Sequence, residues 1–142
     1  DPEGAVLLEV IGKIEKTNHD GKALLDRAML EQLPSATLET TTVVTDGVRH
    51  FNGFYMRDLL TFLEADGETV RARALNDYVI DIPIGDFERF DVIVATHMEG
   101  ARLEPRDKGP LWIVYPRDDY PELQDLRYDY RWVWQLRWLE IQ

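Results

Sequence analysis

The 142-residue sequence contains no cysteine, which excludes disulfide bonds and zinc sites built from cysteine ligands. Its one serine, Ser35, is not part of a glycine-x-serine-x-glycine turn, so the sequence does not favour a serine nucleophile. The longest apolar run, residues 111–115, is far shorter than the roughly 20 residues that span a bilayer. No repeat, low-complexity tract or linker divides the chain. We therefore expect one domain over residues 1–142, without membrane insertion.

Positive charge is also scarce. Sixteen lysine and arginine residues stand against 27 acidic residues, and the formal net charge is -11. An acidic field repels the phosphates of nucleic acids and of anionic membranes, so we expect no nucleic-acid partner. The same field favours a cationic ligand or a basic patch on a partner protein, although solubility alone is the plainer reason for such a composition.

The distribution of apolar residues predicts many strands and few helices. Alternating patterns, threonine- and valine-rich stretches and short apolar runs predict strands at residues 6–11, 37–45, 70–75, 78–82, 92–98 and 111–115, with a further strand ending at residue 51 after an Asp46-Gly47 turn. Helices are expected at residues 28–33, 56–64 and 86–90, with Asp26 capping the first, Asp86 capping the last and Asp66-Gly67 ending the second. This balance predicts an α+β, β-rich mixed fold.

Residues 117–129 form a long, charged stretch that interrupts this pattern. One interpretation is a functional loop, because long loops in compact domains often carry function. The other is a structural segment that covers an edge of the core with Tyr120 and Leu123. Both interpretations stay open. Its carboxylates are interpreted as a solvated face, because clusters of this kind are expected by chance in an acidic protein: Asp118, Asp119, Glu122, Asp125 and Asp129.

The aromatic tail that follows alternates with polar residues from 128 to 139, which predicts a strand with one apolar face. Core packing is the favoured interpretation of Trp134 and Leu136, because aromatic side chains bury large areas. Stacking against a ligand is the alternative. For Tyr128 and Tyr130 the sequence does not distinguish core packing from stacking against a ligand.

Four segments, in this order and spacing, resemble the molybdopterin-binding domain of the sulfite oxidase family in its small, single-domain bacterial form. They are Thr40-Thr41-Thr42 with Phe51-Asn52-Gly53-Phe54 and Arg57-Asp58-Leu59-Leu60; Leu75-Asn76-Asp77-Tyr78; Gly109-Pro110-Leu111-Trp112-Ile113-Val114-Tyr115-Pro116; and Trp134-Gln135-Leu136. The resemblance covers roughly residues 7–141 and implies the same α+β fold. Because small members are often exported, and because a chain without thiols suits an oxidising compartment, we expect a periplasmic location.

The resemblance also implies where a cofactor pocket would lie. Enzymes of the family hold molybdenum partly through a cysteine thiolate, which is expected here near residues 40–42, where only threonine hydroxyls are present. The pocket residues implied are Thr40, Thr41, Thr42, Arg49, His50, Asn76, Asp77, Tyr78, Lys108, Gly109 and Pro110. The enzymes surround the pterin phosphate with several basic groups, and the basic residues near these loops are Arg49, Arg106, Lys108 and Arg117.

A different metal site is also conceivable at His97 and Glu99. They are two residues apart at the end of a predicted strand, so their side chains are expected on one face, as two ligands for zinc or iron. No third ligand has a convincing spacing, and a histidine near a strand end is more often a hydrogen-bonded surface residue.

Three functions follow from these features. The leading one is a non-catalytic module, with a molybdopterin-oxidoreductase-like fold that has lost its metal chemistry, which binds an unknown small ligand or a sensor protein and needs no cofactor. The second is a molybdopterin-dependent oxidoreductase with an atypical metal site. The third is a metal-dependent hydrolase that uses His97 and Glu99.

Overall fold

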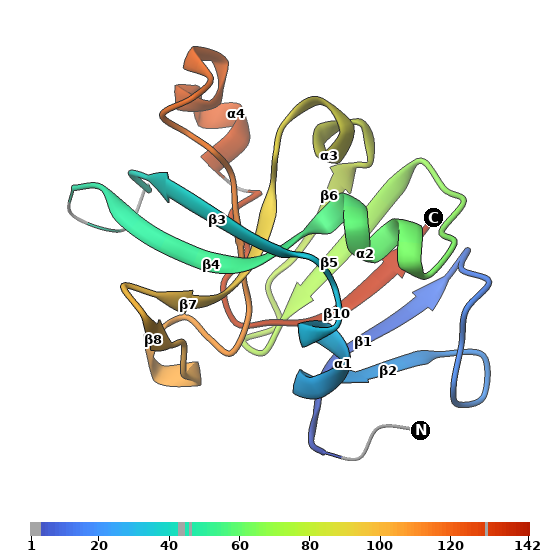
Figure 1. Ribbon diagram of the computed structural model, residues 1–142. Coiled ribbons are helices and arrows are strands. Elements are labelled where there is room, and N and C mark those ends of the chain that lie inside the picture. Colours follow the sequence, from blue (N-terminus) through green and yellow to red (C-terminus); the bar gives the residue numbers. More distant parts are fainter. Residues whose placement is uncertain (1–3, 43–44, 46, 130) are drawn as a thin grey trace.

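The computed structural model describes residues 4–42, 45, 47–129 and 131–142, and it has two sheets with short helices around them (Figure 1). The first sheet has the order β2-β1-β10-β5-β6 and consists of β1 (Val6–Gly12), β2 (Ala23–Asp26), β5 (Thr69–Ala74), β6 (Val79–Pro83) and β10 (Leu136–Ile141). The second has the order β3-β4-β7-β8, with β9 also paired to β7, and consists of β3 (Ser35–Thr40), β4 (Arg49–Tyr55), β7 (Ile93–Met98), β8 (Ala101–Arg102) and β9 (Trp112–Val114).

The helices are all short. They are α1 (Arg27–Glu31), α2 (Met56–Phe62), α3 (Gly85–Arg89) and α4 (Leu126–Asp129), with 3-10 turns η1 (Pro105–Asp107) and η2 (Pro121–Gln124). Strands therefore dominate, and the predicted α+β, β-rich fold is confirmed. In the part of the chain described, no helix is long and apolar enough to cross a membrane.

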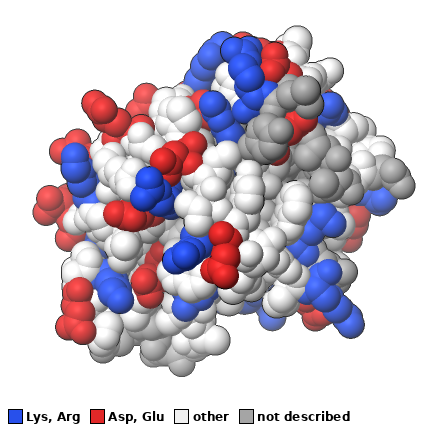
Figure 2. All heavy atoms as spheres, turned by 180° about the vertical axis from the view of Figure 1, so that it is seen from behind, with Lys and Arg blue, Asp and Glu red and all other residues white. Residues whose placement is uncertain are grey.

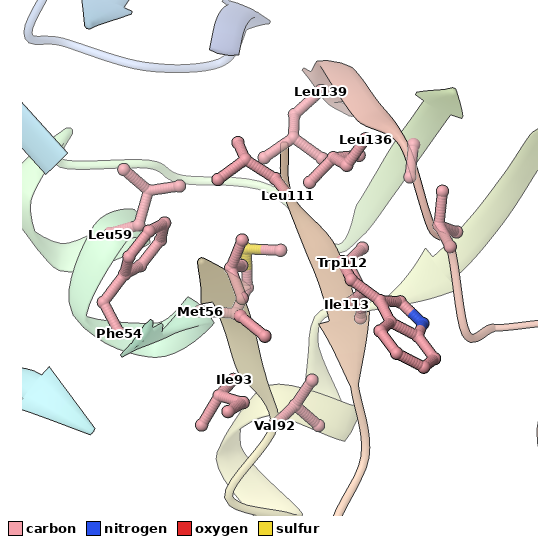
Figure 3. Close-up of a cluster of buried hydrophobic side chains, with 14 of the residues drawn as sticks. Phe54, Met56, Leu59, Val92, Ile93, Leu111, Trp112, Ile113, Leu136 and Leu139 are labelled. Atoms are coloured by element: carbon pink, nitrogen blue, oxygen red, sulfur yellow. The ribbon is translucent and has the colours of Figure 1, made fainter. Parts of the chain in front are cut away.

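The core brings the two sheets together through large apolar side chains. Leu111, Leu136 and Leu139 lie together beside β9 and β10, and Phe54 and Leu59 approach from β4 and α2 (Figure 3). All five are at most 2% exposed. Burying an aliphatic or aromatic side chain of this size stabilises a fold by roughly 1.5–3 kcal/mol, so this cluster holds the sheets in place.

Several locally encoded elements match the predictions. Asp26 caps α1, because its Oδ1 accepts a hydrogen bond from the Met29 N–H at 2.9 Å. The predicted helix at residues 56–64 is α2, and the predicted strands 6–11, 70–75, 78–82 and 92–98 agree with β1, β5, β6 and β7 to within one residue at most ends. In each case the pattern of neighbouring residues was enough to specify the element.

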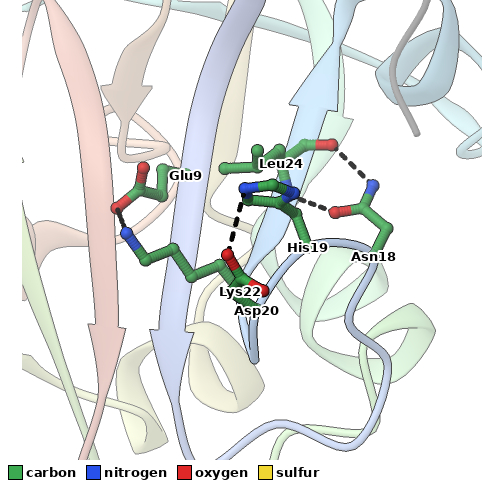
Figure 4. Close-up of polar contacts among 6 residues, drawn as sticks. All are labelled: Glu9, Asn18, His19, Asp20, Lys22 and Leu24. Atoms are coloured by element: carbon green, nitrogen blue, oxygen red, sulfur yellow. Dashed lines mark hydrogen bonds and ion pairs between the residues drawn. The ribbon is translucent and has the colours of Figure 1, made fainter.

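One short strand, β2, was not predicted, and the turn before it explains how it forms. Asn18 fixes the backbone of Leu24, since its Oδ1 accepts from the Leu24 N–H and its Nδ2 donates to the Leu24 carbonyl, both at 2.8 Å (Figure 4). Lys22 lies 3.9 Å from Glu9 on the neighbouring strand β1. The strand therefore depends on a side chain several residues before it.

Three boundary predictions were wrong. The strand predicted at residues 37–45 ends at Thr40, and Thr41 and Thr42 are outside it; Val43, Val44 and Asp46, with the predicted turn, lie outside the described residues. α2 ends before the predicted Asp66-Gly67 stop, and Glu64 takes the positive φ of 52° there. Asp86 lies inside α3 rather than capping it, because its carboxylate bonds to other elements.

The predicted tail strand was also wrong in its first half. Residues 126–129 form α4, Tyr130 lies outside the described residues, and β10 begins only at Leu136. A bulge between Leu136 and Trp138 then shifts the pairing with β5, so that Leu136, Leu139 and Ile141 are the buried positions. An even alternation in the sequence cannot reveal that shift.

The stretch at residues 117–129 covers the core edge, as one of its two interpretations proposed. Leu123 is fully buried, and Tyr120 packs edge-on against Phe90, with ring centroids 4.9 Å apart. Asp86 holds the chain on both sides of this segment. Its Oδ2 accepts a hydrogen bond from the Tyr115 hydroxyl at 2.7 Å, before the segment, and one from Arg131 at 2.6 Å, after it.

Replacing Tyr115 with phenylalanine should change how stability depends on pH. Burial, then the neighbouring charge of Asp86 and the bond to it, raise the pKa of Tyr115 well above its ordinary value. Below about pH 10 both the folded and the unfolded states keep this proton; above it the unfolded state alone loses the proton, so wild-type stability falls by up to about 1.4 kcal/mol per pH unit. Tyr115→Phe should lose about 1.5–3 kcal/mol at pH 7 but decline less steeply. Urea unfolding from pH 7 to 11 measures both, and parallel curves would contradict the assignment.

Candidate functional site

The three threonines at the position where the resemblance places a metal ligand are all hydrogen-bonded. Thr40, at the end of β3, accepts from the Asp118 N–H at 3.0 Å and donates to the Thr41 carbonyl. Thr41 donates to Asp118 Oδ1 and accepts from Arg117 at 3.1 Å. The Thr42 hydroxyl lies 2.6 Å from that of Thr45. These hydroxyls therefore connect the end of β3 to the segment after β9.

Arg49 and His50, which were predicted together, lie on opposite faces of the second sheet. Thr40 pairs with Arg49, and residues two apart on a strand share a face, so Arg49 and Phe51 lie on the same side as Thr40. His50 is on the other side, where its ring nitrogen lies 3.4 Å from Glu39. Only Arg49 is thus available to the predicted pocket.

The face that carries Arg49 is rich in N–H donors that have no acceptor. Phe51 contacts Trp112 edge-on, with centroids 5.3 Å apart, which places the indole on this face. In the described part of the chain, Trp112 Nε1, Arg49 Nε and Arg117 Nε are buried and have no hydrogen-bond partner. Each buried donor left unpaired costs about 1–3 kcal/mol, so these groups favour a ligand that brings acceptors.

A hollow of about 220 Å³ lies on the same face of the second sheet as Arg49 and Phe51, and we call it the basic hollow. Met98, which pairs with Phe51, places it on the same face of the sheet. Among the described residues, three cationic side chains line it, and one of them, Arg106, lies 3.4 Å from Glu104; the lining residues are Thr45, Met98, Ala101, Arg102, Leu103, Arg106 and Lys108. Acidic and basic side chains are interspersed on the face seen in Figure 2, so the net charge of -11 does not set the sign of a local site.

The predicted loop of Lys108, Gly109 and Pro110 reaches this hollow through its lysine. Lys108 Nζ lies 6.0 Å from the centre of the Trp112 ring. The next residue, Gly109, cannot be replaced by a residue with a side chain, because a Cβ at this position would lie 2.4 Å from the Leu103 carbonyl carbon. The position of Lys108 is therefore fixed by close backbone packing next to it.

Asn76, Asp77 and Tyr78 are not part of the basic hollow. Asn76 and Tyr78 line a second hollow of about 210 Å³, which we call the aromatic hollow, together with Asp129, Trp132 and Trp134. Asp77 points elsewhere, 3.8 Å from Arg73. The two regions are connected through Gln135, whose N–H donates to the Lys108 carbonyl and whose carbonyl accepts from the Leu75 N–H.

The proposed pair of His97 and Glu99 loses the geometry on which it rested. β7 ends at Met98, and Glu99 lies in the following turn with a positive φ of 53°, so strand alternation does not align the two side chains. His97 Nδ1 lies 2.8 Å from the Thr96 hydroxyl, whereas Glu99 accepts from the His50 N–H. Among the described residues, no group of three or more His, Asp or Glu side chains is placed to hold a metal ion.

A larger hollow, of about 610 Å³, lies over the first sheet and is a weaker candidate. It is lined from β1, β10, β5 and β6, and its charges are largely paired: Arg71 forms two hydrogen bonds with Asp81. Charges already neutralised by neighbours offer a ligand little electrostatic gain. Volume alone therefore does not select the site.

The residues at positions 40–42 do not fit a molybdenum ion. Molybdenum in the resembled family takes a soft thiolate, and hydroxyls that already bond to carboxylate, guanidinium or another hydroxyl are hard, neutral groups. The basic hollow nearby does suit the anionic part of a ligand. The basic hollow therefore suits the negative charge of the cofactor that the resemblance implies, whereas residues 40–42 do not provide the ligand that its metal requires.

Sequence reasoning missed several residues at these two hollows. Arg102 was not singled out, and Trp112 was expected only as a residue of the strand at 111–115. Asp129 was interpreted as solvated, yet its Oδ1 is buried and unpartnered among the described residues. Trp134, expected in the core, is half-buried and lines the aromatic hollow. Alternation in the aromatic tail was the one available signal, and it could not distinguish a pocket from a core.

A scan against protein-family models finds no match for the chain, and neither does a search of curated proteins. The resemblance to the sulfite oxidase family accordingly stays a prediction.

Removing the carboxylate of Asp118 should expose the end of β3. The Thr41 N–H donates to Asp118 Oδ2 at 2.9 Å, so Asp118→Ala should speed hydrogen exchange of that amide by about tenfold, for a bond worth about 1.4 kcal/mol. Asp119→Ala is the matched control, because Asp119 contributes only its backbone N–H, to the Pro116 carbonyl. Equal exchange rates at Thr41 in the two variants would show that this carboxylate does not hold the segment.

Proposed function

We propose that this chain is a non-catalytic module that binds a small anionic ligand in the basic hollow, against the face that carries Arg49 and Trp112. The observation that carries the proposal is the set of buried N–H groups of Arg49, Trp112 and Arg117, which have no acceptor among the described residues. An oxyanion offers several acceptor lone pairs, and its bonds with charged donors are roughly twice as strong as neutral ones. Arg102 and Lys108 add counter-charge, next to Arg106, which is paired with Glu104.

A binding role is favoured over catalysis by the state of the threonines. A hydroxyl becomes a nucleophile or a base only when a neighbouring group can take its proton. Thr41 already donates to Asp118 and accepts from Arg117, and Thr40 is buried and bonded at both ends. These groups therefore position the chain around the ligand.

The second candidate is a molybdopterin-dependent oxidoreductase with an atypical metal site. The same donors favour it, because a pterin cofactor of this kind carries a phosphate. The difference between the two functions is the metal.

Metal and pterin content of the protein from its native host separates these functions. Elemental analysis should find no stoichiometric molybdenum, and fluorescence after oxidation should find no pterin, since hydroxyls replace the thiolate that would hold the metal. Molybdenum and pterin near one per chain would overturn the non-catalytic proposal and establish the oxidoreductase.

Binding of sulfate, measured by calorimetry, tests the anion site directly. Arg49→Gln should weaken sulfate affinity by about tenfold, because one charge-assisted donor is lost. Arg71→Gln removes the same charge from a residue paired with Asp81 on the first sheet and should leave the affinity within about twofold. An equal loss in both variants would reduce the effect to general electrostatics, and no saturable binding to the wild type would refute the anion site.

A further inference from the structure

The aromatic hollow differs from the basic one in its lining, which is aromatic and carries one acidic side chain among the described residues. It is enclosed by two indoles, one phenol ring and one carboxylate, from Trp132, Trp134, Tyr78 and Asp129, with Asn76 beside them. Within the described part of the chain, no lysine or arginine lines it. Its volume of about 210 Å³ is roughly seven times the 30 Å³ that a water molecule occupies in the liquid. The space therefore suits a compact organic group.

The walls of this hollow come from elements that pack firmly against the core. Trp132 is 2% exposed, and its ring lies 6.2 Å from that of Tyr115. Next in the chain, Arg131 is bonded to Asp86. Asn76 fixes the opposite wall, because its Oδ1 accepts from the Tyr78 N–H at 3.0 Å. The hollow is thus largely preformed, as small-molecule sites usually are.

Asp129 gives the hollow a negative charge that no other described residue neutralises. Its Oδ1 is buried without a hydrogen-bond partner. The nearest cations along the chain are engaged elsewhere, since Arg127 pairs with Asp125 and Arg131 with Asp86. Asp129 is half-buried with one oxygen out of contact with water, and a carboxylate in such a place is stabilised by a positively charged neighbour.

We propose that the aromatic hollow binds a small organic cation, such as a trimethylammonium group. The positive head would lie against the faces of Trp134 and Tyr78, where the negative side of each ring attracts a cation, with Asp129 as the counter-ion. This site is separate from the anion site of the proposed function and does not depend on it, because the two hollows share no lining residue.

Choline and its uncharged isostere 3,3-dimethylbutan-1-ol test the charge requirement on the unmodified protein. They have nearly the same shape, so a preference for choline measures the cationic head alone. Calorimetry should show saturable binding of choline, with the alcohol at least about tenfold weaker. Equal affinity of the two compounds, or no saturable binding of choline, would overturn the inference.

Variants locate the site. Asp129→Asn and Trp134→Leu should each weaken choline binding by about tenfold, whereas Trp134→Phe, which keeps an aromatic face, should stay within about threefold. Asp77→Asn is the charge-matched control, because Asp77 lies between the lining residues Asn76 and Tyr78 but does not line the hollow. This variant should change the affinity by less than about twofold. If Asp77→Asn weakens binding as much as Asp129→Asn, the hollow is not the site.

Sulfate titrated into the same samples separates the two proposals. Sulfate binding without choline binding would refute only the cation site, whereas choline binding without sulfate binding would refute only the anion site. The comparison between choline and the alcohol needs no variant, so it decides the cation site even if Asp129→Asn does not fold.

Discussion

The buried carboxylate of Asp86 is the contact on which both hollows depend. It is 7% exposed, and it accepts hydrogen bonds from Tyr115 on one side and from Arg131 on the other. A carboxylate in such a place is tolerated only when charge and hydrogen bonds satisfy it. Tyr115 follows β9 and Arg131 follows α4, so the two bonds hold both ends of the segment between them. That segment carries Asp118 to the threonines and Asp129 to the aromatic hollow.

The local charge of each hollow depends on which charged side chains line it, rather than on the overall composition. The net charge is -11, yet Arg102, Arg106 and Lys108 gather in one place. Elsewhere acidic and basic groups neutralise each other across strands, as between Arg71 and Asp81. An acidic composition can therefore accompany one hollow lined by Asp129 and another lined by Arg102 and Lys108.

The sequence predicted those elements whose cause lies within a few residues. Asp26 caps the helix that begins next to it, and the apolar spacing of α2 needs no distant partner. Part of the site was predicted less completely: two successive strands were expected here, and β3 and β4 do pair, but the register that sets Arg49 opposite Thr40 was not predicted. What failed depends on distant contacts. Asp86 was taken for a cap because its partners Tyr115 and Arg131 are 29 and 45 residues away.

Gln135 shows most clearly why the aromatic tail was misinterpreted. Its φ is +54°, a conformation that few residues other than glycine adopt, and it is held there from three sides. Its N–H donates to Lys108, its carbonyl accepts from Leu75, and its side chain donates to Pro105. The backbone therefore leaves regular strand geometry between Trp134 and Leu136, which turns the first toward the aromatic hollow and the second into the core. An irregularity stabilised by both loops at once is typical of a functional site rather than of a structural strand.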